Sequence, residues 1–131
     1  MANSVRPFLM FEGKAEEAMN FYVSLFADAV ISDVTRWGPG QPGSEGSFML
    51  GTFTVAGQSV RCFNSPVHHE FAFTPSFSFF VECESEDEIK RLNDALSDGG
   101  SVLMPLDKYD FARQFTWVAD RYGVSWQLNL A

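Results

Sequence analysis

Both histidines of this chain lie in the run His68-His69-Glu70, whose imidazole and carboxylate groups are ligand types for zinc and related metals. Adjacent residues on an extended chain point in opposite directions, and ligand pairs within one segment usually have a wider spacing. No second His-rich segment accompanies them. We therefore expect this run to be part of a solvated connector and not a metal site.

A second cluster of ionisable side chains is Asp107-Lys108-Tyr109-Asp110, which we expect in a loop. Tyr109 or Asp110 could contact a ligand there, although a solvated hairpin turn is the simpler interpretation. The chain contains no nucleophile elbow, phosphate-binding loop or dinucleotide fingerprint. No cofactor is indicated, and no residue can be named as catalytic.

The composition limits the classes of partner. The chain has 131 residues and a formal net charge of −8, with no cluster of Lys and Arg to neutralise phosphates, so nucleic acids and anionic membranes are not expected partners. Cys62 and Cys83 lie in apolar strand patterns and are expected to be buried free thiols, with a disulfide between them as the open alternative.

The N-terminal residues lack the basic and apolar regions of a signal peptide. No apolar run approaches the roughly 20 residues that a membrane-spanning helix requires. We therefore expect a cytoplasmic protein.

An internal repeat indicates the architecture. Residues 57–63 resemble residues 123–129 at an offset of 66, and the strand and helix of residues 9–26 resemble those of residues 80–96 at an offset of 71. Each copy reads as a strand, a helix and three strands.

The repeat predicts these elements in order. Strands are expected at 5–11, 29–37, 47–55 and 59–64, a tight hairpin at Ala56-Gly57, and a helix from Lys14 to Ala27. After a connector at 65–75, strands are expected at 76–83, 101–106, 113–120 and 124–130, with a helix capped by Ser85 and ended by Gly99-Gly100.

Two segments carry a family resemblance. The first, residues 11–18, reads Phe-Glu-Gly-Lys-Ala-Glu-Glu-Ala and continues to Phe21-Tyr22. The second runs from Pro105-Leu106 to residues 123–127, which read Gly-Val-Ser-Trp-Gln. The chain resembles the PhnB-like family, often labelled 3-demethylubiquinone-9 3-methyltransferase, within the vicinal-oxygen-chelate superfamily of glyoxalase I, bleomycin-resistance proteins and extradiol dioxygenases.

The resemblance implies an α+β fold, the glyoxalase/bleomycin resistance fold, in which two tandem βαβββ modules curl their mixed sheets around a cavity, usually in a dimer. Residues 1–131 would then form a single domain, with module 1 at about 1–64 and module 2 at about 76–131. The fold itself does not determine a function, because this scaffold hosts many chemistries.

In metal-dependent members of this superfamily, four inward-facing strand residues supply His or Glu ligands. Strand alternation directs Trp126 and Leu128 toward a helix and Ser125, Gln127 and Asn129 toward the cavity, so the C-terminal ligand position is Gln127. The same alternation directs Phe77, Phe79 and Val81 toward the helix and Ser78 and Phe80 toward the cavity. The repeat offsets then give Arg61 and Pro7 as the equivalents of Gln127 and Ser78 in module 1.

Pro7, Arg61, Ser78 and Gln127 include no carboxylate or imidazole, so we expect no metal at these positions. The candidate ligand-binding residues are Arg61, Ser78, Gln127, Phe63, Phe80 and Tyr109. Arg61 would bind an anionic group whose remaining oxygens Ser78 and Gln127 would contact. The alternative is an Arg61 side chain that reaches solvent or pairs with an acid such as Glu82.

Three functions remain open from the sequence. A metal-free cavity that binds an unknown small molecule is the leading hypothesis. The second is an enzyme, either a lyase or isomerase of the glyoxalase superfamily or the methyltransferase of the family label, and the third is a purely structural dimerisation module. For Trp117 and Trp126, core packing is the simpler expectation, with a place in the binding site as the alternative.

Two expectations concern the whole molecule. The apolar strands Phe48-Met49-Leu50 and Phe77–Val81 would leave sheet faces and edges uncovered in a monomer, so we expect a homodimer. Residues 38–46 are rich in Gly and Pro, and we expect them to form a mobile lid that no side chain anchors.

Overall fold

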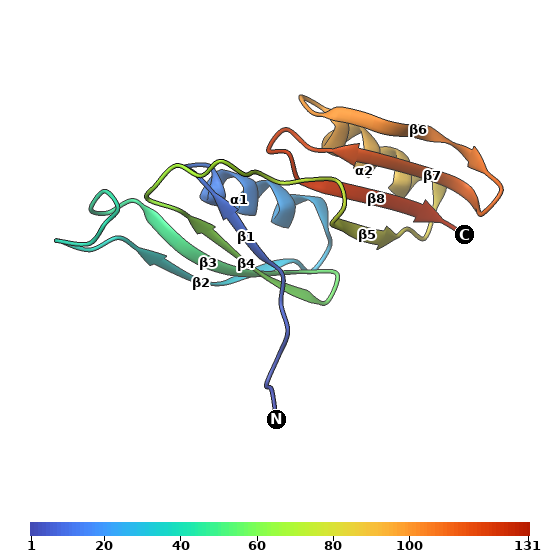
Figure 1. Ribbon diagram of the computed structural model, residues 1–131. Helices are drawn as coiled ribbons and strands as arrows, with labels where there is room; N and C mark the ends of the chain where they lie inside the picture. The colour runs from blue at the N-terminus through green and yellow to red at the C-terminus, as the bar shows by residue number, and fades with distance from the viewer. The chain divides into compact units, whose positions relative to one another are not determined.

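The structure is a computed structural model that describes residues 1–131. Its eight strands and two helices follow one another as two β-α-β-β-β sequences (Figure 1), which confirms the predicted α+β class and the paired βαβββ modules. The first module consists of β1 (Phe8–Phe11), α1 (Ala15–Leu25), β2 (Val30–Arg36), β3 (Phe48–Val55) and β4 (Gln58–Asn64). The second consists of β5 (Ser78–Glu82), α2 (Glu86–Ser97), β6 (Ser101–Tyr109), β7 (Ala112–Ala119) and β8 (Ser125–Leu130).

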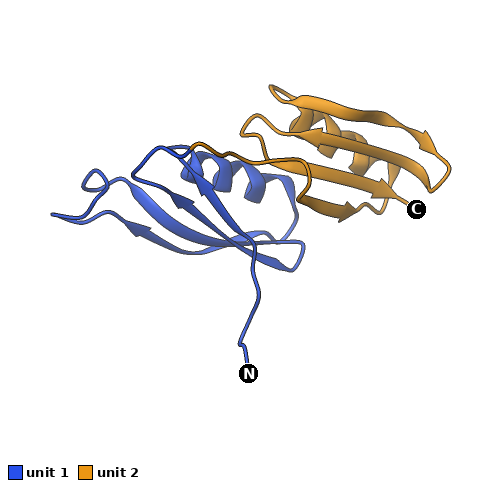
Figure 2. Ribbon diagram, viewed as in Figure 1, with its two compact units in different colours: residues 1–69 blue, residues 70–131 orange.

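The chain divides into two compact units, residues 1–69 and residues 70–131 (Figure 2), which we call unit 1 and unit 2. The boundary between them lies within the segment 65–75 that the sequence assigns to a connector. Neither helix is long and apolar enough to cross a membrane.

Each unit is built on one four-stranded mixed sheet. The strand order is β1-β4-β3-β2 in unit 1 and β5-β8-β7-β6 in unit 2, and the first strand of each unit pairs in parallel with its last. The helix of each unit lies on one face of its own sheet (Figure 1). The opposite face, which we call the helix-free face, is therefore left uncovered by the unit's own helix.

The core of unit 1 lies between α1 and its sheet. The helix buries residues that recur at three- and four-residue spacing, namely Ala15, Ala18, Met19, Tyr22 and Leu25. They meet strand residues such as Phe53, Val60 and Cys62, all of which are almost completely buried. Each large apolar side chain buried in this way contributes about 1.5–3 kcal/mol, so the packing of this helix stripe on the sheet stabilises the unit.

The core of unit 2 follows the same plan. The Ser85 hydroxyl accepts a hydrogen bond from the Glu88 amide and caps α2 as predicted. Ile89, Leu92 and Leu96 of the helix are fully buried, as are Val118, Trp126 and Leu128 of the sheet. After the helix, the chain passes so close to the β7–β8 bend that a Cβ on Gly100 would stand 2.1 Å from the Ala119 carbonyl oxygen. Only glycine fits at that point.

Three boundaries differ from the sequence expectations. The first strand begins at Phe8 and not at residue 5, since Pro7 has no amide proton and contributes only its carbonyl, which accepts from the Arg61 amide. Phe77 precedes β5 and is 62% exposed, so its predicted packing on the helix is wrong. β6 extends to Tyr109, because it pairs with β7 as far as Tyr109 and Ala112.

The predicted hairpin between β3 and β4 is confirmed. Val55 pairs with Gln58, which leaves Ala56 and Gly57 as a two-residue turn with φ of 47° and 81°. Positive φ at both central residues is the type I′ pattern that matches the twist of the flanking strands.

Candidate functional site

The predicted unit 2 candidates Ser78 and Gln127 come together on the helix-free face. The Gln127 amide nitrogen (Nε2) donates to the Ser78 hydroxyl at 3.2 Å, and that hydroxyl lies 2.6 Å from the Ser125 hydroxyl. The parallel register explains this meeting, because Ser78 pairs with Ser125 and Phe80 pairs with Gln127. The prediction that Ser78, Ser125 and Gln127 share a face therefore agrees with the register.

Trp117 joins this polar group, which the sequence did not favour. Its indole nitrogen (Nε1) donates to the Ser125 hydroxyl at 2.8 Å, and its register partner is Gln127. The neighbouring Thr116 faces α2, where its hydroxyl donates to Asn93 at 3.3 Å, so alternation turns Trp117 to the other side. The core-packing expectation is wrong for Trp117 and confirmed for Trp126, which is 2% exposed.

An aromatic cluster lies beside the polar group. The ring of Phe115 has its centroid 6.4 Å from that of Phe80, 5.9 Å from that of Tyr109 and 5.0 Å from that of Phe111. Tyr109 also stacks on Phe111 at 5.6 Å. Two of the predicted ligand-binding residues, Phe80 and Tyr109, thus belong to one apolar surface.

Tyr109 differs from the expected solvated turn residue. It ends β6, is half-buried, and its hydroxyl donates to the Pro105 carbonyl at 2.7 Å. A ligand on this surface would therefore meet the face or edge of the ring and not a free phenol. The exposed turn that the sequence placed here is confined to Asp110 and Phe111.

In unit 1, Arg61 and Phe63 lie on the helix-free face of β4. Their neighbours Val60 and Cys62 are buried toward α1, so alternation places Arg61 and Phe63 on the opposite side. Arg61 is half-buried, and its Nε donates to the Thr52 hydroxyl at 3.3 Å. Phe63 contacts Phe8 and Trp37, with ring centroids 5.9 and 6.2 Å away.

The strand register corrects one position in module 1. Gln127 pairs with Phe80 in unit 2 and Arg61 pairs with Phe8 in unit 1, so the first strands match at an offset of 72 and not 71. The equivalent of Ser78 is then Arg6 and not Pro7. The corrected positions are Arg6 and Arg61 in unit 1 and Ser78 and Gln127 in unit 2, and none of these side chains is a good ligand for a divalent metal.

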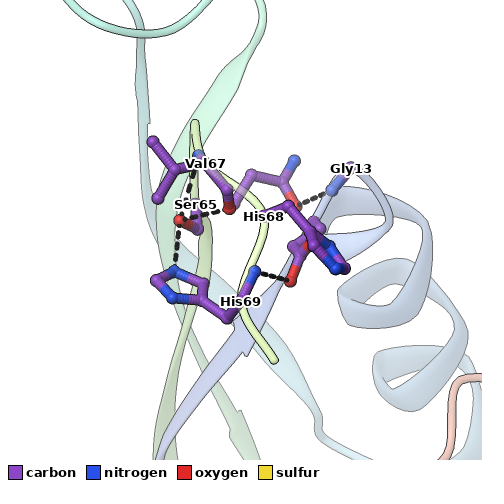
Figure 3. A network of polar contacts seen from close by, with 7 residues as sticks. Gly13, Ser65, Val67, His68 and His69 are labelled. Carbon is purple, nitrogen blue, oxygen red and sulfur yellow. Dashed lines mark hydrogen bonds and ion pairs between the residues drawn. The ribbon is translucent and has the colours of Figure 1, made fainter. Parts of the chain in front are cut away.

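The exposed His68-His69 segment makes polar contacts with the residues that follow β1 and β4 (Figure 3). The His68 Nδ1 lies 2.8 Å from one carboxylate oxygen of Glu12, and the His69 amide donates to the other at 3.2 Å. The His69 Nε2 lies 2.9 Å from the Ser65 hydroxyl. The hydrogen bond from His68, followed by that from the His69 amide, lowers the pKa of Glu12 below its usual value. The segment is the exposed connector that the sequence predicted, with His68 78% exposed, and the contacts with Glu12 fix its position.

Asn64 caps the start of α1, although it lies about fifty residues away in the sequence. Its side-chain oxygen accepts hydrogen bonds from the amides of Gly13 at 3.0 Å and Ala15 at 2.9 Å. The residue at the usual capping position, Lys14, makes no such bond with its own side chain. Asn64 therefore supplies the acceptor that the helix would otherwise lack.

Unit 1 also contains a cavity of about 480 Å³ that the sequence did not predict. It lies where β1 and β4 end, and its lining includes Glu12, Glu16, Arg36, Trp37, Phe48 and Asn64. The whole lining comes from five segments of the chain, so no local sequence motif indicates the site. The one local signal is an aromatic residue, Trp37, directly before a Gly- and Pro-rich loop.

That loop is better anchored than its composition suggests. The Trp37 ring lies across Gly43, where an added Cβ would stand 2.3 Å from the ring. The Trp37 amide donates to the Ser47 carbonyl and the Gly46 amide to the Trp37 carbonyl, both at 2.8 Å. The expectation that no side chain anchors the loop is wrong, and Gly43 is the residue that makes room for the anchor.

The family assignment rests on a match over almost the whole chain. Residues 3–129 match the family model described as 3-demethylubiquinone-9 3-methyltransferase. No match was found among curated proteins.

Solved structures give the same result. The chain is 50% identical to a Bacillus cereus protein described as a putative 3-demethylubiquinone-9 3-methyltransferase, PhnB protein, with a TM-score of 0.94 and coverage of 98% of this chain and 100% of that one. Protein PA1353 from Pseudomonas aeruginosa is 26% identical, with a TM-score of 0.84 and coverage of 98% of both chains.

A glyoxylase/bleomycin resistance protein/dioxygenase domain from Frankia sp. EAN1pec shares the fold at 12% identity, with a TM-score of 0.66 and coverage of 100% of this chain and 93% of that one. The paired βαβββ modules, the family match and these structural relatives agree. The chain belongs to the PhnB-like, or 3-demethylubiquinone-9 3-methyltransferase, family, as its sequence resemblance predicted, and it has the glyoxalase/bleomycin resistance fold.

Proposed function

We propose that this protein binds a small molecule carrying an anionic group, without a metal, on the helix-free face of the unit 1 sheet. The observation that carries the proposal is the position of Arg61. Its guanidinium is half-buried on that face, next to Phe63, and donates to the neutral hydroxyl of Thr52. A guanidinium withdrawn from water is stabilised by an anionic partner, which this hydroxyl does not provide.

The ion pairs of unit 1 support this interpretation. They join Lys14 with Glu17, Arg36 with Glu16, and His68 with Glu12, so Arg61 is not among them. Glu82, the acid considered as its partner from the sequence, accepts from the Asn129 amide group at 3.2 Å. A carboxylate, phosphate or enolate-like group would give Arg61 a charged acceptor in the bidentate geometry that arginine favours.

Unit 2, taken by itself, also carries apolar and polar groups on its own helix-free face. Phe80 is 55% exposed and Phe111 63% exposed, and both contact the buried Phe115. The Ser78, Ser125 and Gln127 cluster offers hydroxyl and amide groups beside these rings. Apolar walls with a few polar groups are typical of small-molecule sites.

The side-chain types at positions 6, 61, 78 and 127 support binding without a metal. Two guanidiniums, a hydroxyl and an amide would repel or only weakly hold a divalent cation. Elemental analysis of protein purified without a His-tag is expected to find no stoichiometric metal. A metal retained through dialysis and lost in the Gln127→Ala variant would contradict this part of the proposal.

The test for the ligand class is a thermal-shift screen with phosphate, citrate and pyruvate as probes. We expect at least one anion to raise the melting temperature of the wild type and to have no effect on Arg61→Ala. Arg91→Ala, which removes an exposed arginine on α2, is the matched control and should respond like the wild type. Equal responses of wild type and Arg61→Ala, or no response to any anion, would refute the proposal.

Methyl transfer is the second candidate, because the matching family model is described as a methyltransferase. Such an activity would require the binding of an S-adenosyl donor, yet the chain has no glycine-rich loop between a strand and a helix of the usual dinucleotide-binding type. Calorimetry with S-adenosylmethionine separates the candidates, since only a methyltransferase is expected to bind it. For either function we propose a cytoplasmic location.

A further inference from the structure

The cavity of unit 1 is separate in composition from the anion site proposed above. It contains neither Arg61 nor Phe63, and its lining joins the start of α1, the end of β2 and the ends of β1 and β4. Its volume of about 480 Å³ lies in the range of small-molecule sites.

The charged side chains of the lining carry a net negative charge. Arg36 is bidentate on Glu16, with Nη2 2.6 Å from one carboxylate oxygen and Nη1 3.4 Å from the other, so these two charges offset each other. Glu12 is the remaining charged residue of the lining. Its hydrogen bonds from the His69 amide and from His68, which can donate as a neutral imidazole, do not remove the negative charge.

One wall of the cavity is aromatic. Trp37 is half-buried and held in place by its packing on Gly43 and by its edge contact with Phe63. Phe48, which also lines the cavity, is 3% exposed. An indole face attracts a cation within about 6 Å of its centre, and more strongly when water is partly excluded.

We propose that this cavity binds a small organic cation, namely a primary amine attached to an apolar group. The ammonium group lies at Glu12, where unused lone pairs of the carboxylate accept its protons. The apolar part lies against Trp37 and Phe48.

The test uses three probes of nearly equal size, which are phenethylamine, 2-phenylethanol and phenylacetate, measured by calorimetry at neutral pH. Phenethylamine is expected to bind more tightly than the neutral alcohol, and phenylacetate least. The indole N–H resonance of Trp37, assigned with Trp37→Phe, should shift on addition of the amine. The amide spectrum of each variant reports whether it is folded.

Two variants that change the amine affinity in opposite directions make the test specific. Glu12→Gln is expected to weaken amine binding about fivefold, and Arg36→Gln to strengthen it by a similar factor because it leaves Glu16 without its counter-ion. Glu86→Gln, an equal charge change on the exposed start of α2, is the control and should leave the affinity unchanged.

Phenylacetate binding as tightly as phenethylamine, or an amine affinity that does not change in Glu12→Gln, would overturn the inference. Weaker amine binding in both Glu12→Gln and Arg36→Gln would also overturn the inference. A loss of local structure would lower the affinity in both variants, whereas a charge effect changes it in opposite directions. Arg61→Ala should not alter amine binding, so failure of this site and failure of the anion site are distinguishable.

Discussion

Asp120 is the residue whose side chain is most fully used by the fold. One carboxylate oxygen accepts from the amides of Tyr122 at 2.8 Å and Val124 at 3.0 Å, and the other accepts from the Trp126 indole at 3.0 Å. The bonds to the bend are of the local kind that an Asp before a tight turn often makes, so the sequence itself suggests them. It did not predict the bond to Trp126, which connects the bend to the core of unit 2.

Asp120→Ala is expected to destabilise the protein by about 3 kcal/mol, because it leaves buried donors without acceptors. Asp120→Asn should recover part of this loss, since it keeps one oxygen but places an amino group at the other position. Urea unfolding followed by tryptophan fluorescence measures both, with Asp110→Ala on the exposed β6–β7 turn as the control. A loss below 1 kcal/mol in Asp120→Ala would contradict this role.

The two cysteines are free and buried, as predicted. Burial raises the pKa of the Cys62 thiol to about 12 and that of the Cys83 thiol to about 11. Because the raised pKa favours the neutral thiol, roughly one Cys62 in ten thousand is thiolate at pH 8.

Both thiols should therefore resist a disulfide reagent such as DTNB at pH 8 in the folded protein and react fully in guanidinium chloride. Cys83, with the lower pKa and 8% exposure, should react before Cys62 as the pH rises. Rapid labelling of the native protein at pH 7 would show that the strands open on the timescale of the reaction.

At the scale of elements, the start of α1 depends on a residue about fifty positions away. Asn64→Ala removes the acceptor for the Gly13 and Ala15 amides and is expected to cost about 1–2 kcal/mol. Asn64→Asp should keep most of the stability, since a carboxylate oxygen can accept the same bonds and favours a helix N-terminus. Chemical denaturation measures each variant, with Asn20→Ala on the exposed face of α1 as the control. If Asn64→Ala were as stable as the wild type, the Asn64 side chain would not be a cap of α1 that contributes to stability.

We still predict that the loop between β2 and β3 is a mobile lid, although the Trp37 ring packs on Gly43 and backbone hydrogen bonds hold Gly46 and Ser47. Hydrogen exchange should be fast at residues 38–45 and slower at Gly46 and Ser47, whose amides are bonded to the Trp37 and Ser44 carbonyls. Trp37→Ala should accelerate exchange throughout the loop, because the ring packed on Gly43 is lost. Protection across 38–45 equal to that in β8 would contradict the lid.

At the scale of the whole molecule, apolar side chains remain exposed on the sheets. Val30 and Val34 lie on the edge strand β2, Val102 and Leu103 on the edge strand β6, and Phe8 and Phe80 on helix-free faces. Open edges and apolar faces of this kind are usually covered in a stable protein. We therefore propose a homodimer.

Sedimentation at micromolar concentration is expected to give the mass of a dimer. Phe80→Asp should shift the equilibrium toward monomer, whereas Asp87→Asn at the exposed start of α2 should not. A wild type that sediments only as a monomer would exclude the dimer.

The sequence alone determined the elements and their order. Alternation of side chains on strands is a local property, so the burial of Trp126 and Leu128 against the helix could be predicted from the chain. The internal repeat then identified the module, and the resemblance in residues 11–18 and 105–127 identified the family.

Tertiary structure decided the contacts between distant segments. The one-residue correction from Pro7 to Arg6 came from the ladder between β1 and β4, because register is set by pairing between strands and not within one. Likewise, Asn64 meets Gly13 and His68 meets Glu12 only after the sheet has formed. The cavity in unit 1 arises from the same cause, since its lining is spread over segments that only the folded sheet brings together.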